Sequence, residues 1–101
     1  MSVIRIKDFI NTDFAGTRVV GERIRLEIEK SLPLGGGVTL DFVLLDMITQ
    51  SFADEIIGIL VRVNGAKFVG ENIRLVNANK EIIDTINFVI KYSSRKHKEV
   101  A

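Results

Sequence analysis

One stretch of the sequence decides the fold: residues 38–65 read VTLDFVLLDMITQSFADEIIGILVRVNG. Apolar and polar side chains alternate over residues 38–42, the period of two that indicates a strand with one buried face. Ser51 then precedes an acidic residue three positions later and a long apolar run, a pattern typical of a helix that begins with a serine cap. Gly65 is a typical helix stop. The stretch therefore predicts a strand, a connecting loop and an apolar helix over residues 51–64.

The segments on either side repeat this order of strand and helix. Residues 4–7 alternate apolar and basic side chains as a first strand, and a polar connector follows at residues 11–13. An apolar residue at every fourth position then marks a helix over residues 17–32. After the central helix, residues 72–76 alternate again as a third strand, and residues 77–79 offer a cap for a third apolar helix.

The alternation in all three strands determines the predicted architecture. Strands joined by helices lie parallel in one sheet, because the crossover between them is long and right-handed. A strand buried on both faces would read as a continuous apolar run, so the alternation places the helices on one face only. We therefore predict a single small α/β domain of βαβαβα order, with a mostly parallel or mixed sheet and helices on one face.

Composition sets the size and the cellular setting that we expect. The chain has 101 residues, of which 47% are hydrophobic and 27% charged, so it suits one globular domain, predicted over residues 1–92. Residues 93–101 are basic and lack an apolar period, and we expect a disordered tail there. Cysteine, a signal-peptide pattern and an apolar run of roughly 20 residues are all missing, which favours a cytoplasmic protein.

The sequence offers little catalytic chemistry. The glycines at residues 35–37 follow a helix and open a strand, which indicates a turn and not the phosphate-binding loop that follows a strand. The only histidine, His97, lies in the predicted tail, away from any triad or zinc site in the core. Asp41 and Asp46 lie near the end of the second strand, but neither has an obvious partner that could act as the base to its acid or as the acid to its base. We expect no cofactor, no metal and no enzymatic activity.

Four segments carry a resemblance to a known family. They are Gly16-Thr17-Arg18, Leu40-Asp41-Phe42, residues 48–58 and residues 73–79. Together they resemble a bacterial STAS-like family whose members are largely uncharacterised, and the likeness extends over most of the chain. Its most specific part is the Ser-Phe-Ala-Asp-Glu block that begins at Ser51. The resemblance implies a STAS-like fold with a docking surface.

More distantly, the order of segments is similar to that of the STAS domain of anti-sigma-factor antagonists. In those proteins a partner kinase, which is also the anti-sigma factor, phosphorylates a serine at the start of the corresponding helix and so ends the binding. Ser51 takes the position of that serine along the chain, and Phe52 stands where the antagonists have glycine. The resemblance implies a non-catalytic regulatory module that docks a protein partner, such as a histidine-kinase-fold ATPase or an anti-sigma-type kinase.

The same resemblance implies where the partner docks, namely at the N-terminus of the second helix. Ser51 is the phosphorylation candidate, with Thr49 as a second hydroxyl, and Phe52, Asp54 and Glu55 are the expected partner contacts. An exposed Phe52 would favour this hypothesis, and a buried one would weaken it. The structural alternative for Ser51 is a plain helix cap, a role in which serine is among the preferred residues.

Two further functions stay open. Arg95, Lys96 and Lys98 could contact phosphates from the predicted tail, so a nucleic-acid-associated accessory or structural protein is the alternative. The formal net charge of +1 gives no strong field toward nucleic acid or anionic lipid, so we expect neither a nucleic acid nor a membrane as the main partner. A small-molecule binder at the carboxyl ends of the strands is the third hypothesis.

Overall fold

The computed structural model describes residues 2–10 and 14–100, so the connector predicted at residues 11–13 lies outside the described residues. No helix in this part of the chain is long and apolar enough to cross a membrane. The elements, in chain order, are β1 (Ser2–Arg5), η1 (Ile6–Phe9), β2 (Phe14–Ala15), α1 (Arg18–Ser31), η2 (Leu32–Leu34), β3 (Val38–Asp41), β4 (Met47–Ile48), α2 (Gln50–Ala53), η3 (Asp54–Gly58), α3 (Ile59–Asn64), α4 (Ala66–Asn72), β5 (Ile73–Val76) and α5 (Lys80–Val100).

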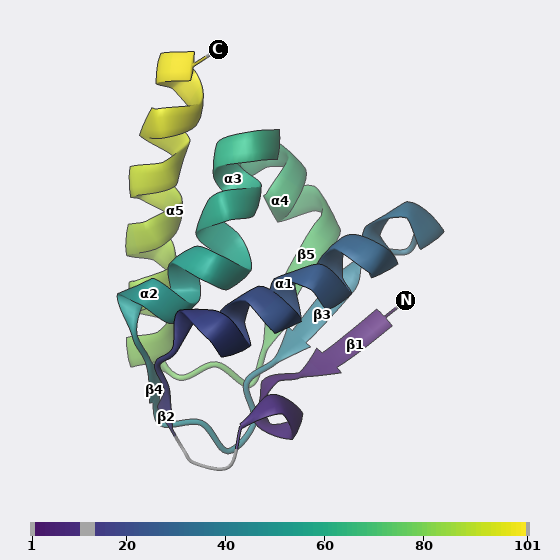
Figure 1. Ribbon diagram of the computed structural model, residues 1–101, viewed down its shortest axis with the longest axis vertical. Coiled ribbons are helices and arrows are strands. Elements are labelled where there is room, and N and C mark those ends of the chain that lie inside the picture. The colour runs from purple at the N-terminus through teal and green to yellow at the C-terminus, as the bar shows by residue number, and fades with distance from the viewer. Residues whose placement is uncertain (1, 11–13, 101) are drawn as a thin grey trace.

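The three predicted strands form one parallel sheet in the order β1-β3-β5 (Figure 1), but the first strand lies at Ser2–Arg5, earlier than the predicted residues 4–7, because the chain turns into η1 at Ile6. Val38 of the central strand β3 pairs with Ser2 of β1 on one side and with Ile73 of β5 on the other. Because the chain moves across the sheet in one direction, right-handed crossovers place α1 and the central helices on the same face. The structure confirms a small α/β domain with helices on one face of a parallel sheet.

A second, two-stranded parallel sheet and the short helix α4 are additions to the predicted architecture. In the second sheet β2 pairs with β4, so that Phe14 lies opposite Met47. Each of these strands has only two residues, too few for an alternating pattern to reveal. The pairing holds the start of α1 beside the start of α2, where Thr49 Oγ1 donates to the carbonyl oxygen of Gly16 at 3.1 Å. Two helix starts that are distant in sequence therefore lie side by side.

The apolar stripes predicted on the helices meet in one core. The largest fully buried side chains are Phe42, Phe52, Ile6, Ile24, Ile28, Leu40, Ile56, Ile57, Ile82, Ile86, Val38 and Val61. The third predicted helix begins where expected, because Asn79 Oδ1 accepts a hydrogen bond from the N–H of Ile82 at 2.9 Å. The glycines at residues 35–37 have φ angles of 82°, 79° and 78°, a conformation that glycine adopts without strain, which confirms the turn.

The central helix begins earlier than predicted, and its cap is Thr49 instead of Ser51. Thr49 Oγ1 accepts a hydrogen bond from the N–H of Phe52 at 3.0 Å, and Gln50 is the first helical residue. Ser51 lies inside the first turn, which corrects the prediction of a serine cap. The physical reason is that a capping residue needs extended backbone ahead of the helix, and Thr49 has it with a ψ of 162°.

From this start one continuous helix runs through α2, η3 and α3 and ends at Gly65, as predicted. Its middle, Asp54–Gly58, is a π-helical turn in which the N–H of Ile59 donates to the carbonyl oxygen of Asp54. Such turns are rare in proteins overall, and those that do occur often lie at functional sites. The irregular segment therefore directs attention to Asp54 and its surroundings.

The C-terminal segment is helical and not a disordered tail, as far as the structure describes it. Helix α5 continues to Val100 and stands along the side of the domain (Figure 1). Ser93 is fully buried, and His97 Nδ1 donates to the carbonyl oxygen of Arg62 at 2.9 Å. The prediction is wrong because these polar residues continue the buried side of α5 beyond Val89, where an apolar period is no longer visible. Residue 92 is therefore no structural boundary.

Candidate functional site

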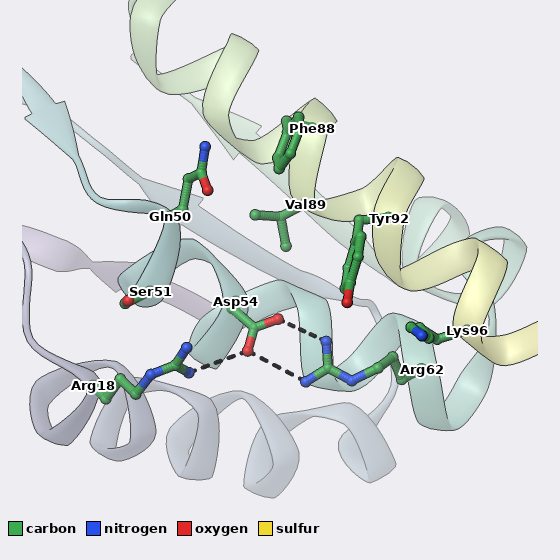
Figure 2. A pocket seen from close by; sticks show the side chains of 9 residues that line it. All are labelled: Arg18, Gln50, Ser51, Asp54, Arg62, Phe88, Val89, Tyr92 and Lys96. Carbon is green, nitrogen blue, oxygen red and sulfur yellow. Dashed lines mark hydrogen bonds and ion pairs between the residues drawn. The ribbon is translucent and has the colours of Figure 1, made fainter.

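A groove opens between the start of α1, the first turns of the central helix and one flank of α5 (Figure 2). Its volume is ≈ 780 Å³. It combines three cations, one acid, two small polar groups and an apolar wall, contributed by Arg18, Gln50, Ser51, Asp54, Arg62, Phe88, Val89, Tyr92 and Lys96. Because these residues come from three distant segments, the groove exists only in the folded chain.

Asp54 lies between two arginines in this groove (Figure 2). Arg62 approaches its carboxylate with both ends of the guanidinium group, Nη1 at 2.6 Å from Oδ1 and Nη2 at 3.3 Å from Oδ2. Arg18 donates from Nη1 to Oδ2 at 3.2 Å. Since Arg18 belongs to α1 and Arg62 to α3, the carboxylate ties the two helices together.

The same contacts set the pKa of the Asp54 carboxyl. Partial burial alone would raise this pKa, but the hydrogen bonds from Arg62 and Arg18 outweigh the burial, so the pKa of Asp54 lies below its ordinary value. The hydrogen bond with Asp54 in turn raises the pKa of Arg18 and the pKa of Arg62. At neutral pH Asp54 is therefore an ionised carboxylate that holds the groove together, and it has no proton to donate as a general acid.

Glu55 extends the ion-pair network away from the groove. Its Oε1 lies 3.1 Å from Nη1 of Arg18, and its Oε2 lies 3.5 Å from Nη2 of Arg25. The side chains of Asp54 and Glu55 are only 20% and 13% exposed. Both acids were predicted as partner contacts, and the structure engages both in ion pairs within the chain. Of the two, only Asp54 lines the groove.

Gly58 allows α5 to approach the π-helical turn closely. A Cβ atom at this position would lie 2.8 Å from Val89 Cγ1 and 3.0 Å from Ser93 Oγ, and it would press against the Asp54 carboxylate. Ser93 Oγ also accepts a hydrogen bond from Arg62 Nη1 at 3.0 Å. The two walls of the groove are thus fixed to each other by direct contact behind its open side.

The two predicted hydroxyls have different surroundings. Thr49 Oγ1 caps the central helix and donates to the Gly16 carbonyl, so both of its hydrogen-bonding roles are filled. Ser51 is half-buried and lines the groove, and its hydroxyl has no hydrogen-bond partner among the residues that the structure describes. Thr49 is thus a structural residue, whereas Ser51 lies in the lining of the groove and takes no part in the helix cap.

Phe52 is fully buried and cannot reach a partner, which corrects its prediction as a contact and weakens docking through this side chain. The exposed aromatic residues of the groove are Phe88 and Tyr92 on α5, at 55% and 52% exposure. Sequence reasoning missed both. Their spacing of four residues beside the buried stripe of Ile82 and Ile86 places them together on one flank of the helix, and that spacing was the available signal.

The cations predicted to act from a tail lie on α5 instead. Lys96 Nζ lies 5.7 Å from the centroid of the Tyr92 ring, within the range of a cation–π interaction, and it lines the groove. Arg95 is exposed on the same helix. The side chain of Lys98 lies outside the described residues. The structure therefore brings one of the three predicted cations into the groove.

The other candidates for chemistry have structural roles. Asp41 Oδ1 accepts hydrogen bonds from the N–H of Val43 at 3.0 Å and from Asn77 Nδ2 at 2.9 Å, which fastens the loop after β3 to the end of β5. Asp46 offers its backbone carbonyl to Asn79 Nδ2 at 2.8 Å. Within residues 2–10 and 14–100, no group of three or more His, Cys, Asp or Glu residues could hold a metal ion.

The fold, with its parallel sheet, its helices on one face and the serine at the start of the central helix, is that of a STAS-like domain. The model of the family described as STAS-like domain of unknown function (DUF4325) matches residues 20–82, more than half of the chain. The chain belongs to this family, as its sequence resemblance implied. No curated protein and no solved structure shows significant similarity to it.

Proposed function

We propose that this STAS-like domain is a non-catalytic regulatory module that docks a partner protein in the groove between α2 and α5. The observation that carries the proposal is the exposure of Phe88 and Tyr92, at 55% and 52%, beside the polar first turn of the central helix. Aromatic residues and arginine are enriched at protein interfaces, and neighbouring exposed apolar side chains mark interaction sites. Docking thus uses α5 as well as the helix start that the sequence singles out.

The groove is held in shape before any partner arrives. Arg18, Asp54 and Arg62 link three helical segments, and the contact between Gly58 and α5 fixes the aromatic wall. A surface that is already ordered loses little conformational freedom on binding, which favours affinity. This rigidity supports recognition of a folded or helical partner surface.

Ser51 provides the switch of this module. Ser51 lines the groove, its hydroxyl has no partner among the described residues, and the helix cap is Thr49, so phosphorylation of Ser51 would leave the cap intact. A phosphate adds about −1.5 to −2 charges at neutral pH, which the N-terminal end of the helix tolerates. In the groove it would compete for Arg18 and displace a partner. The fold survives phosphorylation and docking does not.

The family resemblance supports a proposal for the class of partner. We propose a regulatory protein, with a histidine-kinase-fold ATPase or an anti-sigma-type kinase as the first candidates. Such a partner both binds the groove and supplies the phosphoryl group for Ser51. The domain itself then needs no catalytic residues, in keeping with an Asp54 that is ionised and engaged by two arginines.

Affinity capture from the native host tests the proposal. The bait proteins are the wild-type chain, Ser51→Glu and the double variant Phe88→Ser with Tyr92→Ser, each checked for folding by circular dichroism. The control is Leu34→Ser, because Leu34 is 80% exposed but lies outside the groove. Wild type and control are expected to retain a regulatory protein that both groove variants lose.

The result is then repeated with purified components. We expect the retained regulator to bind the wild type at least tenfold more tightly than either groove variant. Retention of the same proteins by all four baits, or of none by any bait, would contradict docking in this groove. If a regulator binds Ser51→Glu but not the aromatic variant, docking in the groove is supported and the phosphorylation switch at Ser51 is contradicted.

A further inference from the structure

We infer that the segment which binds in the groove is acidic and presents an apolar side chain between its carboxylates. The inference rests on the proposed docking function and adds the chemistry of the partner. It is carried by the charge of the groove, by the side of the Arg18 guanidinium group that contacts none of the described residues, and by the order of side chains along α5.

The groove concentrates positive charge on a chain that is nearly neutral overall. Its lining holds the three cations Arg18, Arg62 and Lys96 and a single acid, Asp54, whereas basic and acidic residues nearly balance over the whole chain, which carries a net charge of +1. The other acid of this network, Glu55, is turned toward Arg18 and Arg25 and stays out of the lining. Complementary charge guides partners to interfaces and rejects partners of the same sign.

Arg18 is placed to receive a carboxylate. Its side chain is 55% exposed, and its ion pairs with Asp54 and Glu55 both use Nη1. With respect to the described residues, Nη2 and Nε therefore remain available as donors. Arginine binds carboxylates best through two parallel N–H donors, and Nε and Nη2 form such a pair.

The side chains along α5 give the expected order of groups in the partner. Phe88, Tyr92 and Lys96 are spaced by four residues and lie on one flank of the helix, with the Lys96 ammonium group 5.7 Å from the Tyr92 ring centroid. Arg18 and Lys96 lie at opposite ends of the groove (Figure 2). A matching segment places an apolar side chain on Phe88 and Tyr92 and carboxylates toward both ends.

A nucleic acid fits this surface less well. Its backbone requires a run of cations that follows successive phosphates. The exposed flank of α5 that carries Phe88 also carries two acids, Asp84 one turn before it and Glu81 two turns before it. These acids would repel a phosphate chain, whereas a short acidic peptide segment can end at Phe88.

Selection from an unbiased peptide library tests the inference. Phage that display random 12-residue peptides are selected on the full chain, on Lys96→Glu and on the double variant Arg18→Glu with Lys96→Glu. The control is Lys67→Glu with Arg74→Glu, which reverses two exposed charges outside the groove. Lys96→Glu alone is included because Arg18 also supports the fold through Asp54.

The wild type and the control are expected to select peptides in which Asp and Glu flank an aliphatic or aromatic residue. A synthetic peptide of this consensus should bind Lys96→Glu at least fivefold, and the double variant at least twentyfold, more weakly than wild type. Selections on the double variant should lose the acidic residues. Binding should also weaken as salt rises, as expected for exposed charges.

Three results would overturn the inference in distinguishable ways. Peptides that require Phe88 and Tyr92 but show no acidic enrichment would refute the acidic partner and leave groove docking intact. Acidic peptides that bind the double variant as tightly as wild type would show that Arg18 and Lys96 do not recognise them. If no selected peptide depends on groove residues, the inference fails, and the affinity capture with groove variants decides the proposed function separately. If a single-stranded oligonucleotide occupies the groove instead, both the inference and the proposed function fail.

Discussion

The two walls of the groove arrange their aromatic and polar side chains in opposite ways. In the central helix Phe52 is fully buried, while Ser51 lies on the groove side. In α5 the polar Ser93 is fully buried, while Phe88 and Tyr92 are more than half exposed. The central helix thus buries an aromatic ring and presents a serine to the groove, whereas α5 buries a serine and presents two aromatic rings.

The two helices approach each other closely at the buried serine of α5. Val89 and Ser93 of α5 lie so close to Gly58 that a Cβ atom there would come within 3.0 Å of both, and Arg62 donates a hydrogen bond to the hydroxyl of Ser93. An aromatic ring cannot fit there, so the large side chains of this part of α5 lie on its flank. The exposed aromatic pair thus lies beside this tightly packed contact, and it gives the groove its apolar wall.

The largest effect that distinguishes the walls is expected from Phe52→Ala and Phe88→Ala. Phe52→Ala removes a fully buried ring and should lower the free energy of unfolding by about 3–5 kcal/mol. Phe88→Ala removes a ring that is 55% exposed and should change it by less than about 0.5 kcal/mol. Urea denaturation followed by circular dichroism measures both.

Binding should show the opposite order. A folded Phe88→Ala protein is expected to lose partner affinity without losing stability, which no core residue can do. Comparable destabilisation by the two variants would mean that Phe88 packs in the core and that the two walls do not differ as described.

A smaller effect is expected at the contact between the walls. Gly58→Ala introduces a Cβ atom against Val89, Ser93 and Asp54 and should lower the free energy of unfolding by about 1–3 kcal/mol. Gly70→Ala is the matched control, because a Cβ atom there meets nothing within 4 Å. In helix α4 this control should be neutral or stabilising by up to about 1 kcal/mol.

Thermal unfolding of the two glycine variants checks this contact. If Gly58→Ala is as stable as Gly70→Ala, the C-terminal half of α5 moves away from the π-helical turn at little cost. In that case the prediction of a loosely held segment after residue 92 would be closer to the behaviour in solution than the docked helix is.

The sequence was sufficient for the main elements of the fold because their signals are local. Alternation marked β1, β3 and β5, an apolar stripe marked α1, and Asn79 and Gly65 marked a helix start and a helix end. The cap of the central helix was misplaced because Thr49 and Ser51 are both good caps, and only the backbone conformation decides between them. Two-residue strands are too short to leave a pattern.

The groove could be predicted only in part, because most of it depends on contacts between distant residues. Ser51 and Asp54 were identified from their place at a helix start. Arg18 and Arg62 were not, since nothing near them in the sequence shows that they meet one carboxylate. Lys96 was placed in a tail for another reason, because polar residues at the end of a chain are usually solvated and α5 was taken to end before its last turns.

The smallest expected effect concerns the carboxylate that joins the walls. The pKa of Asp54 is lowered in the folded chain relative to its ordinary value of 3.8. A lowered pKa stabilises the folded state at a pH above the unfolded value, and this contribution is lost as the pH falls through the folded value. Asp54→Asn should therefore cost on the order of 1 kcal/mol at pH 7 and pH 5, and progressively less below pH 4.

Urea midpoints of wild type and Asp54→Asn at pH 7, 5, 4 and 3 give this difference directly. Asp8→Asn, at an exposed position outside the groove, is the control and should stay within about 0.5 kcal/mol of wild type at pH 7. A difference between wild type and Asp54→Asn that persists undiminished at pH 3 would mean that hydrogen-bond geometry, and not the ionised carboxylate, holds Arg18 and Arg62. The Asp54 carboxylate also positions the Arg18 donors that are proposed to bind a partner. A difference that persists at pH 3 would therefore also predict that partner affinity does not change when Asp54 is protonated.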